Sequence, residues 1–598
     1  MVYSLKKQKT LFLVVFVTCF IYSQEDSSYA TIHNLCEQAK ACINAERYRD
    51  AIPLLHEALA IDHKNIHAQL YLAHALSSDH NYTDALAVYK KIAPTMPESA
   101  DIAFNMGMCA YQLNSIPEAI SYFEQALERN TESIYAHLHL IGALEKNHQY
   151  TQAMTACKRF LSIKPLHREG LLSAGIIAKQ LDLFEDAAWY YRTLYNQYPE
   201  DVQAIVELAA VLITLEEYEE ALTLYTKALS LKPESLSVFY NLGFTLKKLG
   251  YIDEAIAIYK QILTQKPEYA LAHFSLGLAY LTKGNFQAGL PEYEWRWKVY
   301  QEEPHTKPIP QWDGSSLTGK KIYVYAEQGY GDTFQCVRYL LELKKMGAYI
   351  VFAPQQGLIP LMKLVPHIDE VRSLRDTVSG CDYQVALMSL PLLCKTTLDT
   401  IPAENPYLNA DPQLVKLWQQ IFDTIPSSTY RIGICWHGNS QYKDQSLRRA
   451  VQQKSCPLSL FAMLAEIPNV QLFSLQKVSG LSEINDLEDG RFVTLFADTI
   501  DTAHGRFMDT AAIISHLDLV ITVDTAIAHL AAALGIETWN LLPEPADWRW
   551  MINRSDTPWY PMMRLFRQSK RGNWQGLMYN VQQALKEKTN TLQIQKSA

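Results

Sequence analysis

The chain has 598 residues, of which 48% are hydrophobic and 20% charged, and this composition excludes an intrinsically disordered protein and predicts several globular domains. The formal net charge of -9 gives the surface no overall attraction for nucleic acid, because an acidic protein repels phosphates. We therefore expect no nucleic-acid partner.

Residues 1–30 have the layout of a secretory signal peptide. Three lysines precede an apolar run from Leu11 to Tyr22, and a polar stretch follows it. The run is short for a membrane span and no small-x-small cleavage site follows, so a short membrane anchor and an extra buried helix stay open beside a cleaved signal. The pattern favours export or membrane association through the N-terminus, and a cytoplasmic location follows if the segment is not functional.

A fixed period of 34 residues dominates the stretch 32–303. Glycines precede several members of an alanine series at a constant spacing, and prolines follow several members at the same spacing. This pattern predicts a series of helix pairs, each closed by a proline. The alanine series is Ala51, Ala85, Ala119, Ala153, Ala187, Ala221 and Ala255.

Small residues let two antiparallel helices approach closely, so we expect glycine or alanine of the first helix to face alanine of the second. An aromatic residue follows most of these alanines by one helical turn and should bury against the neighbouring repeat. These aromatic residues are Tyr89, Phe123, Tyr191, Tyr225 and Tyr259.

This pattern resembles the tetratricopeptide repeat over eight units, the last of them degraded where Gly289 replaces the alanine. The resemblance implies an α-solenoid that docks a protein or peptide. The O-linked N-acetylglucosamine transferases line such a groove with an asparagine ladder, which is mostly absent here. A spacer or a dimerisation arm is the alternative reading. The ladder positions read Glu37, Tyr71, Asn105, His139, Ser173, Glu207, Asn241 and Ser275.

Beyond a proline-rich linker, 304–318, strand-like and helix-like segments alternate. This alternation predicts two doubly wound lobes, 319–425 and 430–588, and then a disordered end, 589–598. Ligands in such sheets bind beyond the carboxyl ends of the strands, so we expect the site between the lobes. Strands are expected at 321–326, 348–353, 431–436, 470–475, 492–496, 517–523 and 537–542, and helices at 333–346, 458–466, 509–516 and 525–534.

Familiar catalytic motifs are missing from this half. The segment 314–321 lacks the Ser/Thr of a phosphate loop and precedes its strand, and 329–332 has too few glycines for a nicotinamide site. HExxH, GxSxG and DxD do not occur, and the ten cysteines form no CxxC pair. Zinc proteolysis, serine hydrolysis, sugar transfer of the DxD type and a resident metal are therefore not expected.

Three runs, 326–335, 433–439 and 524–535, resemble landmarks of the heptosyltransferase-like glycosyltransferases, glycosyltransferase family 9. The whole chain resembles bacterial proteins that fuse such a domain to tetratricopeptide repeats. The resemblance covers 312–585 and implies a GT-B fold of two Rossmann-like lobes after the α-solenoid, an α + α/β architecture. It also implies inverting, metal-independent transfer of a sugar from a nucleotide-diphosphate sugar, which is a co-substrate, without a cofactor.

Inversion in one step needs a base for the acceptor hydroxyl, and the aspartate of the family's first landmark falls on Asp332. A helix cap formed by Asp332 with Gln335 is the alternative role, and the two are compatible.

The donor is expected at the two glycines of the first landmark, at the turn after the second and at the helix start of the third. Free backbone N–H groups at a helix start suit a diphosphate. Cations must neutralise the leaving group if no metal does. A plain helix cap with a satisfied histidine and a solvated basic loop are the alternatives. The donor residues predicted are Gly329, Gly331, Trp436, His437, Gly438, Asn439, Lys443, Arg448, Asp524, Thr525, Ala526 and His529, with Arg449 as a further cation.

The tail interleaves tryptophans with arginines, for example in Asp547-Trp-Arg-Trp550. A strap that packs one lobe against the other is favoured over stacking on a ligand.

Two functions therefore compete. The first is a glycosyltransferase whose repeats recruit a protein or glycan acceptor. The second is a non-catalytic interaction scaffold with a degenerate transferase-like domain.

Overall fold

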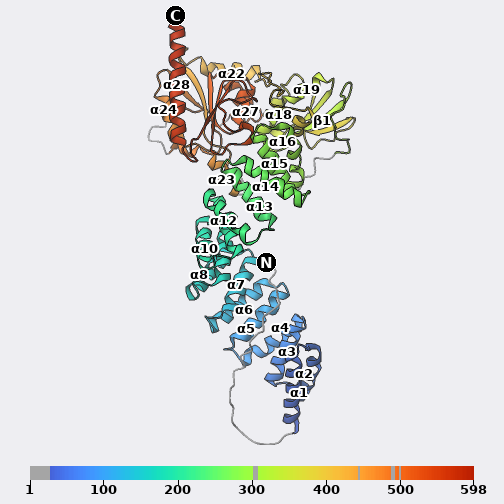
Figure 1. The fold of residues 1–598 in the computed structure, drawn as a ribbon. Helices are drawn as coiled ribbons and strands as arrows, with labels where there is room; N and C mark the ends of the chain where they lie inside the picture. Colours follow the sequence, from blue (N-terminus) through green and yellow to red (C-terminus); the bar gives the residue numbers. More distant parts are fainter. Residues whose placement is uncertain (1–26, 301–306, 442–444, 486–491, 497–499, 598) are drawn as a thin grey trace. The chain divides into compact units, whose positions relative to one another are not determined.

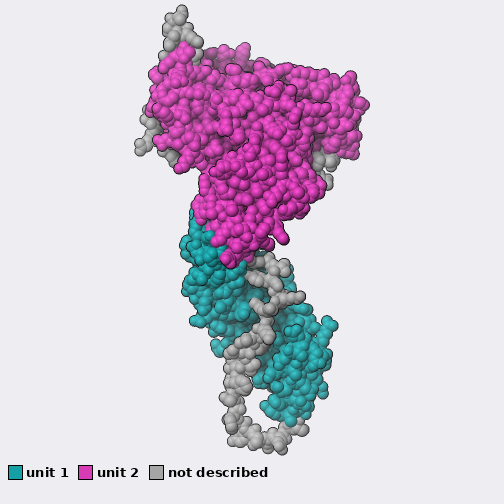
Figure 2. All heavy atoms as spheres, in the orientation of Figure 1, with its two compact units in different colours: residues 1–199 teal, residues 200–598 magenta. Residues whose placement is uncertain are grey.

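The computed structural model describes residues 27–300, 307–441, 445–485, 492–496 and 500–597. Most of the signal-like segment and the first part of the proline-rich linker lie outside these residues. The chain divides into two compact units, Met1–Pro199 and Glu200–Ala598, which Figure 2 colours separately. Among the described residues, no helix is long and apolar enough to cross a bilayer.

The first unit consists of helix pairs in its described part, one pair for each repeat (Figure 1). Side chains cap the first helix of several pairs at the spacing of the repeat, through Asn65, Ser99 and Ser133. The helices are α1 (Ser27–Asn44), α2 (Tyr48–Ile61), α3 (Ile66–Ser78), α4 (Tyr82–Ile92), α5 (Ala100–Gln112), α6 (Ile116–Arg129), α7 (Ile134–Lys146), α8 (Tyr150–Ile163), α9 (Arg168–Gln180) and α10 (Phe184–Gln197).

Three more pairs open the second unit, so the helical solenoid comprises eight pairs in the described residues, as predicted. A short helix, α17 (Arg296–Tyr300), follows them. The pairs are α11 (Val202–Thr214) with α12 (Tyr218–Leu231), α13 (Leu236–Lys248) with α14 (Ile252–Gln265), and α15 (Ala270–Thr282) with α16 (Phe286–Tyr293).

The structure corrects the expected packing of two repeat glycines, because Gly107 and Gly175 lie closest to an aromatic side chain and not to an alanine. A Cβ on Gly107 would lie 2.6 Å from the Phe123 ring, and a Cβ on Gly175 would lie 2.4 Å from Tyr191. Helical side chains lean towards the N-terminus of their helix, so the aromatic residue of the second helix covers the glycine of its own repeat. Phe123 also stacks on His139 of the next repeat, with 5.7 Å between ring centroids.

The first α/β lobe holds a parallel sheet of order β3-β2-β1-β4. The helix predicted at 333–346 starts earlier and is broken into α18 and α19, with the buried Arg338 in the break. The elements are β1 (Lys321–Tyr325), α18 (Tyr330–Cys336), α19 (Tyr339–Lys345), β2 (Tyr349–Ala353), α20 (Ile359–Met362), β3 (Glu370–Val371), β4 (Tyr383–Ala386) and α21 (Leu390–Leu393). The next helix, α22 (Pro412–Phe422), packs on α26 (Met508–Ile514) of the second lobe.

The second lobe holds a parallel sheet of order β10-β9-β8-β5-β6-β7. Two parallel sheets flanked by helices are consistent with the GT-B type of glycosyltransferase fold. The elements are β5 (Tyr430–Cys435), α23 (Gln445–Gln453), η4 (Leu458–Phe461), α24 (Ala462–Ala465), β6 (Val470–Ser474), α25 (Ser482–Asn485), β7 (Val493–Thr494), α26 (Met508–Ile514), β8 (Leu519–Val523), α27 (Ala526–Ala533), β9 (Thr538–Leu542), η6 (Trp548–Trp550), β10 (Met563–Arg567) and α28 (Trp574–Ser597).

The end of the chain differs from the prediction. Helix α28 continues to Ser597, through the stretch 589–598 for which disorder was expected. Thr589 is buried there, and its hydroxyl donates to the Leu585 carbonyl at 3.0 Å. Packing of the preceding turns therefore stabilises the helix, which continues through residues that are polar.

One hydrophobic core joins the last repeat to both lobes. It contains Leu281 and Tyr293 of the repeats, Ile322 of β1, and Leu530 of α27. Tyr293 packs on Trp548 of η6, with 6.0 Å between ring centroids. The last repeat is thus an integral part of the second unit.

Candidate functional site

Asp332 lies in the first turn of α18, directly beyond the carboxyl end of β1. Its Oδ2 accepts a hydrogen bond from the Gly329 backbone N–H at 2.8 Å. The predicted cap with Gln335 is wrong, because the helix begins at Tyr330, before the expected start. Gln335 instead accepts from the Arg549 Nε at 2.8 Å.

Arg549 of η6 joins the two lobes. Its guanidinium contacts the other carboxylate oxygen of Asp332, and its Nη1 pairs with Asp547 Oδ1 at 2.8 Å. Burial would lower the pKa of Arg549, but Asp547 and Asp332 raise it well above its usual value. Burial likewise opposes the charge of Asp547, but Arg549 and Lys454 lower the pKa of that carboxyl to about 2. Arg549 and Asp547 are therefore both charged at neutral pH.

Asp524 follows β8 and is held by two donors. The Trp550 indole Nε1 donates to one oxygen at 3.0 Å, and the Lys454 Nζ pairs with the other at 3.0 Å. The Thr525 hydroxyl accepts from the Ile527 N–H at 3.3 Å and thereby caps α27. Neighbouring side chains of η6, Arg549 and Trp550, thus hold Asp332 and Asp524, one from each lobe.

His529 lies one turn further along α27 and is buried, with 4% of its surface exposed. Its Nδ1 shares a hydrogen bond of 2.8 Å with the Tyr560 hydroxyl, and its ring stacks on Trp550 at 5.2 Å. Burial lowers the pKa of His529 to about 3, so the ring is neutral. A Cβ on Gly331 would lie 3.0 Å from His529 Cδ2, which shows that the glycine permits the close approach of α18 to α27.

The turn after β5 is organised by Gln476, which lies two residues beyond the end of the neighbouring strand, β6. Its Oε1 accepts from the backbone N–H groups of Trp436 and His437 at 3.1 and 3.0 Å, and its Nε2 donates to the His437 carbonyl at 2.9 Å. The two N–H groups that were expected to face the donor are therefore already bonded. Asn439 is exposed at the tip of the turn.

A cavity of about 270 Å³ opens beside this turn, at the carboxyl end of β6. The prediction placed the site between the lobes, whereas this cavity lies within the second lobe, and α18 and α27 are in contact. The lining combines apolar walls with amide, hydroxyl and ammonium groups. It consists of Ser474, Leu475, Gln476, Lys477, Val478, Leu481, Leu495, Phe496, Ile500, Thr510 and Ile513.

The predicted residues thus divide into groups. Asp332, Asp524 and His529 share one network, and Trp436 to Asn439 follow β5, which pairs with β8. A Cβ added to Gly331 would lie 3.6 Å from the Cα of Ala526. Lys443 falls outside the described residues, Arg448 is exposed, and Arg449 is half-buried.

The sequence analysis missed the cations that the structure places at the aspartates. Lys454 follows α23 with no motif around it, so no signal marked it. Arg549 was assigned to a strap between the lobes, and its contacts with Asp332 and Gln335 confirm that strap. Its position two residues after Asp547, the other charged residue of that segment, was the available signal for a role at the site.

Family models agree with this architecture. Models described as tetratricopeptide repeat match residues 43–103, 104–167 and 240–297, and a TPR repeat model matches 211–250. The model described as glycosyltransferase family 9 (heptosyltransferase) matches residues 481–539, a stretch that includes α26, β8 and α27.

A curated relative is protein FlbA of Caulobacter vibrioides (strain ATCC 19089 / CIP 103742 / CB 15), 24% identical over 327 residues. The match covers 51% of this chain and 53% of that protein, so the chain spans about half the length of this relative.

Among solved structures, YrrB, a TPR protein with an unusual peptide-binding site, is 18% identical, with a TM-score of 0.29 over 31% of this chain and 96% of YrrB. A tetratricopeptide repeat protein from Parabacteroides merdae ATCC 43184 is 14% identical, with a TM-score of 0.31 over 42% of this chain and 99% of that one.

Proposed function

Because the chain is a tetratricopeptide-repeat protein with a heptosyltransferase-like domain, we propose that it transfers a sugar from a nucleotide-diphosphate donor to an acceptor recruited by the repeats. One observation carries this proposal above the others. Asp332 and Asp524, from different lobes, are held by adjacent side chains of η6, so a base and an anion-binding helix start are close together.

In the proposed reaction, the diphosphate lies at the start of α27, where backbone N–H groups and the helix dipole favour negative charge. The acceptor hydroxyl oxygen attacks the anomeric carbon while the bond from that carbon to the diphosphate breaks. A single displacement of this kind inverts the anomeric centre. Lys454 and Arg549 supply positive charge for the departing nucleoside diphosphate, which makes a metal unnecessary.

Asp332 takes the proton of the acceptor hydroxyl in this mechanism. Its two oxygens already accept from Gly329 and Arg549, but a carboxylate has about four lone-pair sites. A lone pair therefore remains for the acceptor. The contact with Arg549 fixes the orientation of the carboxylate, as a base requires.

The cavity beside the Trp436 turn suits the base of the nucleotide. Its walls at Leu475, Leu495 and Phe496 are apolar, and Gln476 and Thr510 place polar groups among them. A flat heterocycle with polar edges matches such a lining. The strands β5, β6 and β8 are neighbours in the sheet, so their carboxyl ends place the base and the diphosphate on one edge.

Asp332→Asn tests the base directly. Asparagine keeps the shape of the side chain but cannot accept a proton, so turnover of the nucleotide sugar should fall by about 10²-fold or more, with donor affinity changed by less than about threefold. The control is Asp399→Asn, an exposed aspartate of the same lobe, which should leave turnover unchanged. Full turnover by Asp332→Asn would remove the base from the proposal.

A scaffold without catalysis is the competing function, and the bonded N–H groups of Trp436 and His437 favour it. A domain that had lost its donor site would give no calorimetric heat with any nucleoside diphosphate, whereas the transferase requires such binding.

A further inference from the structure

Tyr293, the last residue of α16, departs from the packing of the preceding repeat. It follows Tyr259 by 34 residues, so the two tyrosines occupy the same position in their repeats. A Cβ on Gly243 would lie 2.8 Å from the ring of Tyr259, whereas a Cβ on Gly277 would lie 2.8 Å from the backbone N of Tyr293. The ring of Tyr293 therefore does not cover the glycine of its own repeat as the ring of Tyr259 does.

The hydroxyl of Tyr293 instead binds Gln328, in the turn between β1 and α18. It donates to Gln328 Oε1 at 3.2 Å and accepts from Gln328 Nε2 at 2.9 Å. Tyr293 is buried in the core that joins the last repeat to both lobes. Burial raises the pKa of Tyr293, so the hydroxyl keeps its proton at neutral pH and can donate.

The backbone of Gln328 is strained. Its φ is +60°, in the left-handed region that a residue with a Cβ rarely adopts. The side chain is held by Tyr293, and Gln355 Nε2 donates to the carbonyls of Gln328 and Gly329 at 3.2 and 3.3 Å. The next backbone N–H, that of Gly329, donates to Asp332 Oδ2 at 2.8 Å. The strained residue thus directly precedes a donor to the proposed base.

The ring of Tyr293 packs on the segment that carries a second donor to the same carboxylate. Its centroid lies 6.0 Å from that of Trp548, and the guanidinium of Arg549 lies over the Trp548 ring at 4.6 Å. Arg549 contacts the other oxygen of Asp332. One side chain of the solenoid therefore supports both segments from which the described residues donate to Asp332.

We propose that Tyr293 is a positioning residue for Asp332, so that the last repeat completes the proposed active site. The inference rests on the proposed function and gives the solenoid a part in the chemical step, in addition to recruitment of the acceptor. A base must stay directed at the acceptor hydroxyl, and small displacements of reacting groups lower the rate steeply. The Tyr293 hydroxyl touches no substrate in this proposal and acts through Gln328.

The test uses Tyr293→Phe in the full chain, which removes the hydroxyl and keeps the ring beside Trp548. The matched control is Tyr259→Phe, at the same position of the preceding repeat, where the ring is buried 6.1 Å from that of Tyr240. Release of nucleoside diphosphate from UDP-glucose, ADP-glucose and GDP-mannose measures turnover. Thermal melts establish the folded fraction of each variant.

Tyr293→Phe should lower kcat about tenfold and change KM for the donor by less than about threefold, because the base is displaced while the start of α27 is not. Gln328→Met removes the same hydrogen bond from the other side and should lower kcat by a similar factor. The double variant should be no slower than either single variant, because each change removes one shared interaction. A hydroxyl that only stabilised the fold would leave kcat per folded molecule unchanged, as we expect for the control.

Hydrogen exchange measured by mass spectrometry tests the same restraint without an activity assay. The backbone over 326–332 should exchange at least about threefold faster in Tyr293→Phe than in the wild type, because the turn loses the bond that holds Gln328. The control should exchange there at the wild-type rate.

The outcomes separate the inference from the proposed function. Turnover by the wild type with an unchanged kcat in Tyr293→Phe would overturn the inference alone, whether or not KM rises. Faster exchange over 326–332 in a chain that turns over none of the donors would support the restraint of the turn and overturn the transferase. No turnover together with unchanged exchange would overturn both.

Discussion

At the residue scale, Arg549 does the most to organise the site. Its fork contacts Asp332, Gln335 and Asp547, and 10% of its side chain is exposed. The neighbouring Trp550 binds Asp524 and stacks on His529. Sequence patterns located the two aspartates, because they follow strand ends, but could not identify their partners, which lie far away in the chain.

Arg549→Met should destabilise the second unit and abolish transfer. The change removes the arginine that pairs with both Asp332 and Asp547, so the free energy of unfolding should fall by about 2 kcal/mol, a value discounted for partial exposure. Urea unfolding followed by tryptophan fluorescence measures the loss.

Arg554→Met is the matched control, because the carboxylate that Arg554 pairs with in the described part of the chain is that of the exposed Asp556 in the same tail. Its effect should stay within about 0.5 kcal/mol. Equal stability of the two variants would contradict the account of Arg549.

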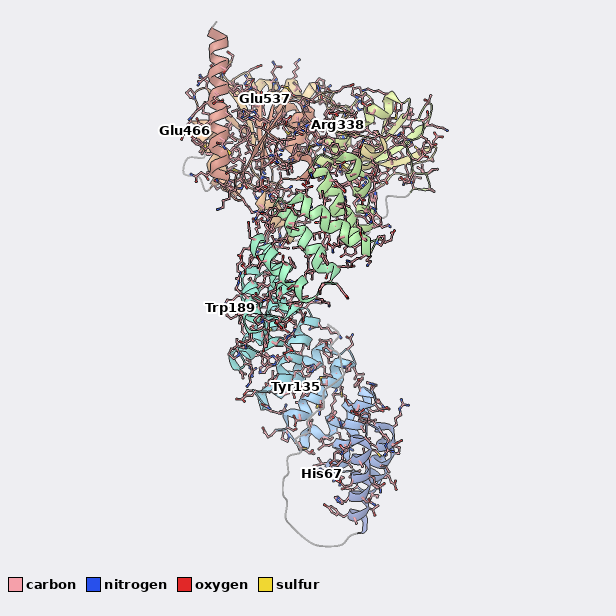
Figure 3. All side chains as sticks on the ribbon, in the orientation of Figure 1. His67, Tyr135, Trp189, Arg338, Glu466 and Glu537 are labelled. Carbon is pink, nitrogen blue, oxygen red and sulfur yellow. The ribbon has the colours of Figure 1, made fainter. Side chains whose placement is uncertain are left out.

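At the element scale, most strands were predicted, but β3, β4 and β10 were not. β3 has two residues, too few for a period to be visible. β7, expected at 492–496, also has only two residues. The helix expected at 333–346 breaks at Arg338, which Figure 3 labels. Arg338 is buried, donates to the Tyr407 hydroxyl at 2.8 Å and lies 4.7 Å from the centroid of the Tyr560 ring. The sequence does not show that this arginine is buried, so the break in the helix could not be predicted from it.

The contact between α18 and α27 depends on Gly331. Gly331→Ala places a methyl group 3.0 Å from His529 Cδ2, and the buried histidine cannot move without losing Tyr560. The melting temperature should therefore fall, by an amount equivalent to about 1 kcal/mol, and transfer should slow as the lobes shift. Differential scanning calorimetry and the transfer assay measure the two effects.

Gly142→Ala is the control for a helical glycine, since an added Cβ there meets nothing within 4 Å. It should leave stability unchanged or increase it by up to about 1 kcal/mol. A Gly331→Ala variant as stable as this control would show that the helices do not need a glycine at their contact.

At the scale of the whole molecule, the repeats and the lobes of the second unit are built as one body. Arg296 of α17 is buried, donates to Glu327 at 2.9 and 2.7 Å, and donates to Ser389 at 2.9 Å. Glu327 belongs to the turn that leads to Asp332. The sequence predicted repeats, linker and lobes in their order, but a linear pattern cannot show that the last repeat enters the core of the lobes.

Arg296→Met should test this coupling. The substitution leaves the carboxylate of Glu327, 8% exposed, without its cation, which should cost about 3 kcal/mol of the unfolding free energy. Lys298 lies on the same short helix as Arg296 and forms an exposed ion pair with Glu268. Lys298→Met should therefore change stability by less than about 0.5 kcal/mol. Unfolding in urea compares the two variants. A similar midpoint for both would contradict a structural role for the ion pair of Arg296 with Glu327.

The proposed transfer requires above all that the donor lies at the carboxyl ends of β5, β6 and β8. Photoaffinity labelling with an azido-nucleoside-diphosphate sugar, followed by peptide mass spectrometry, measures this directly. We predict labelled peptides from 474–481, with labelling suppressed by excess unlabelled nucleoside diphosphate. Specific labelling confined to the repeats of the first unit, or no suppressible labelling at all, would contradict the central claim.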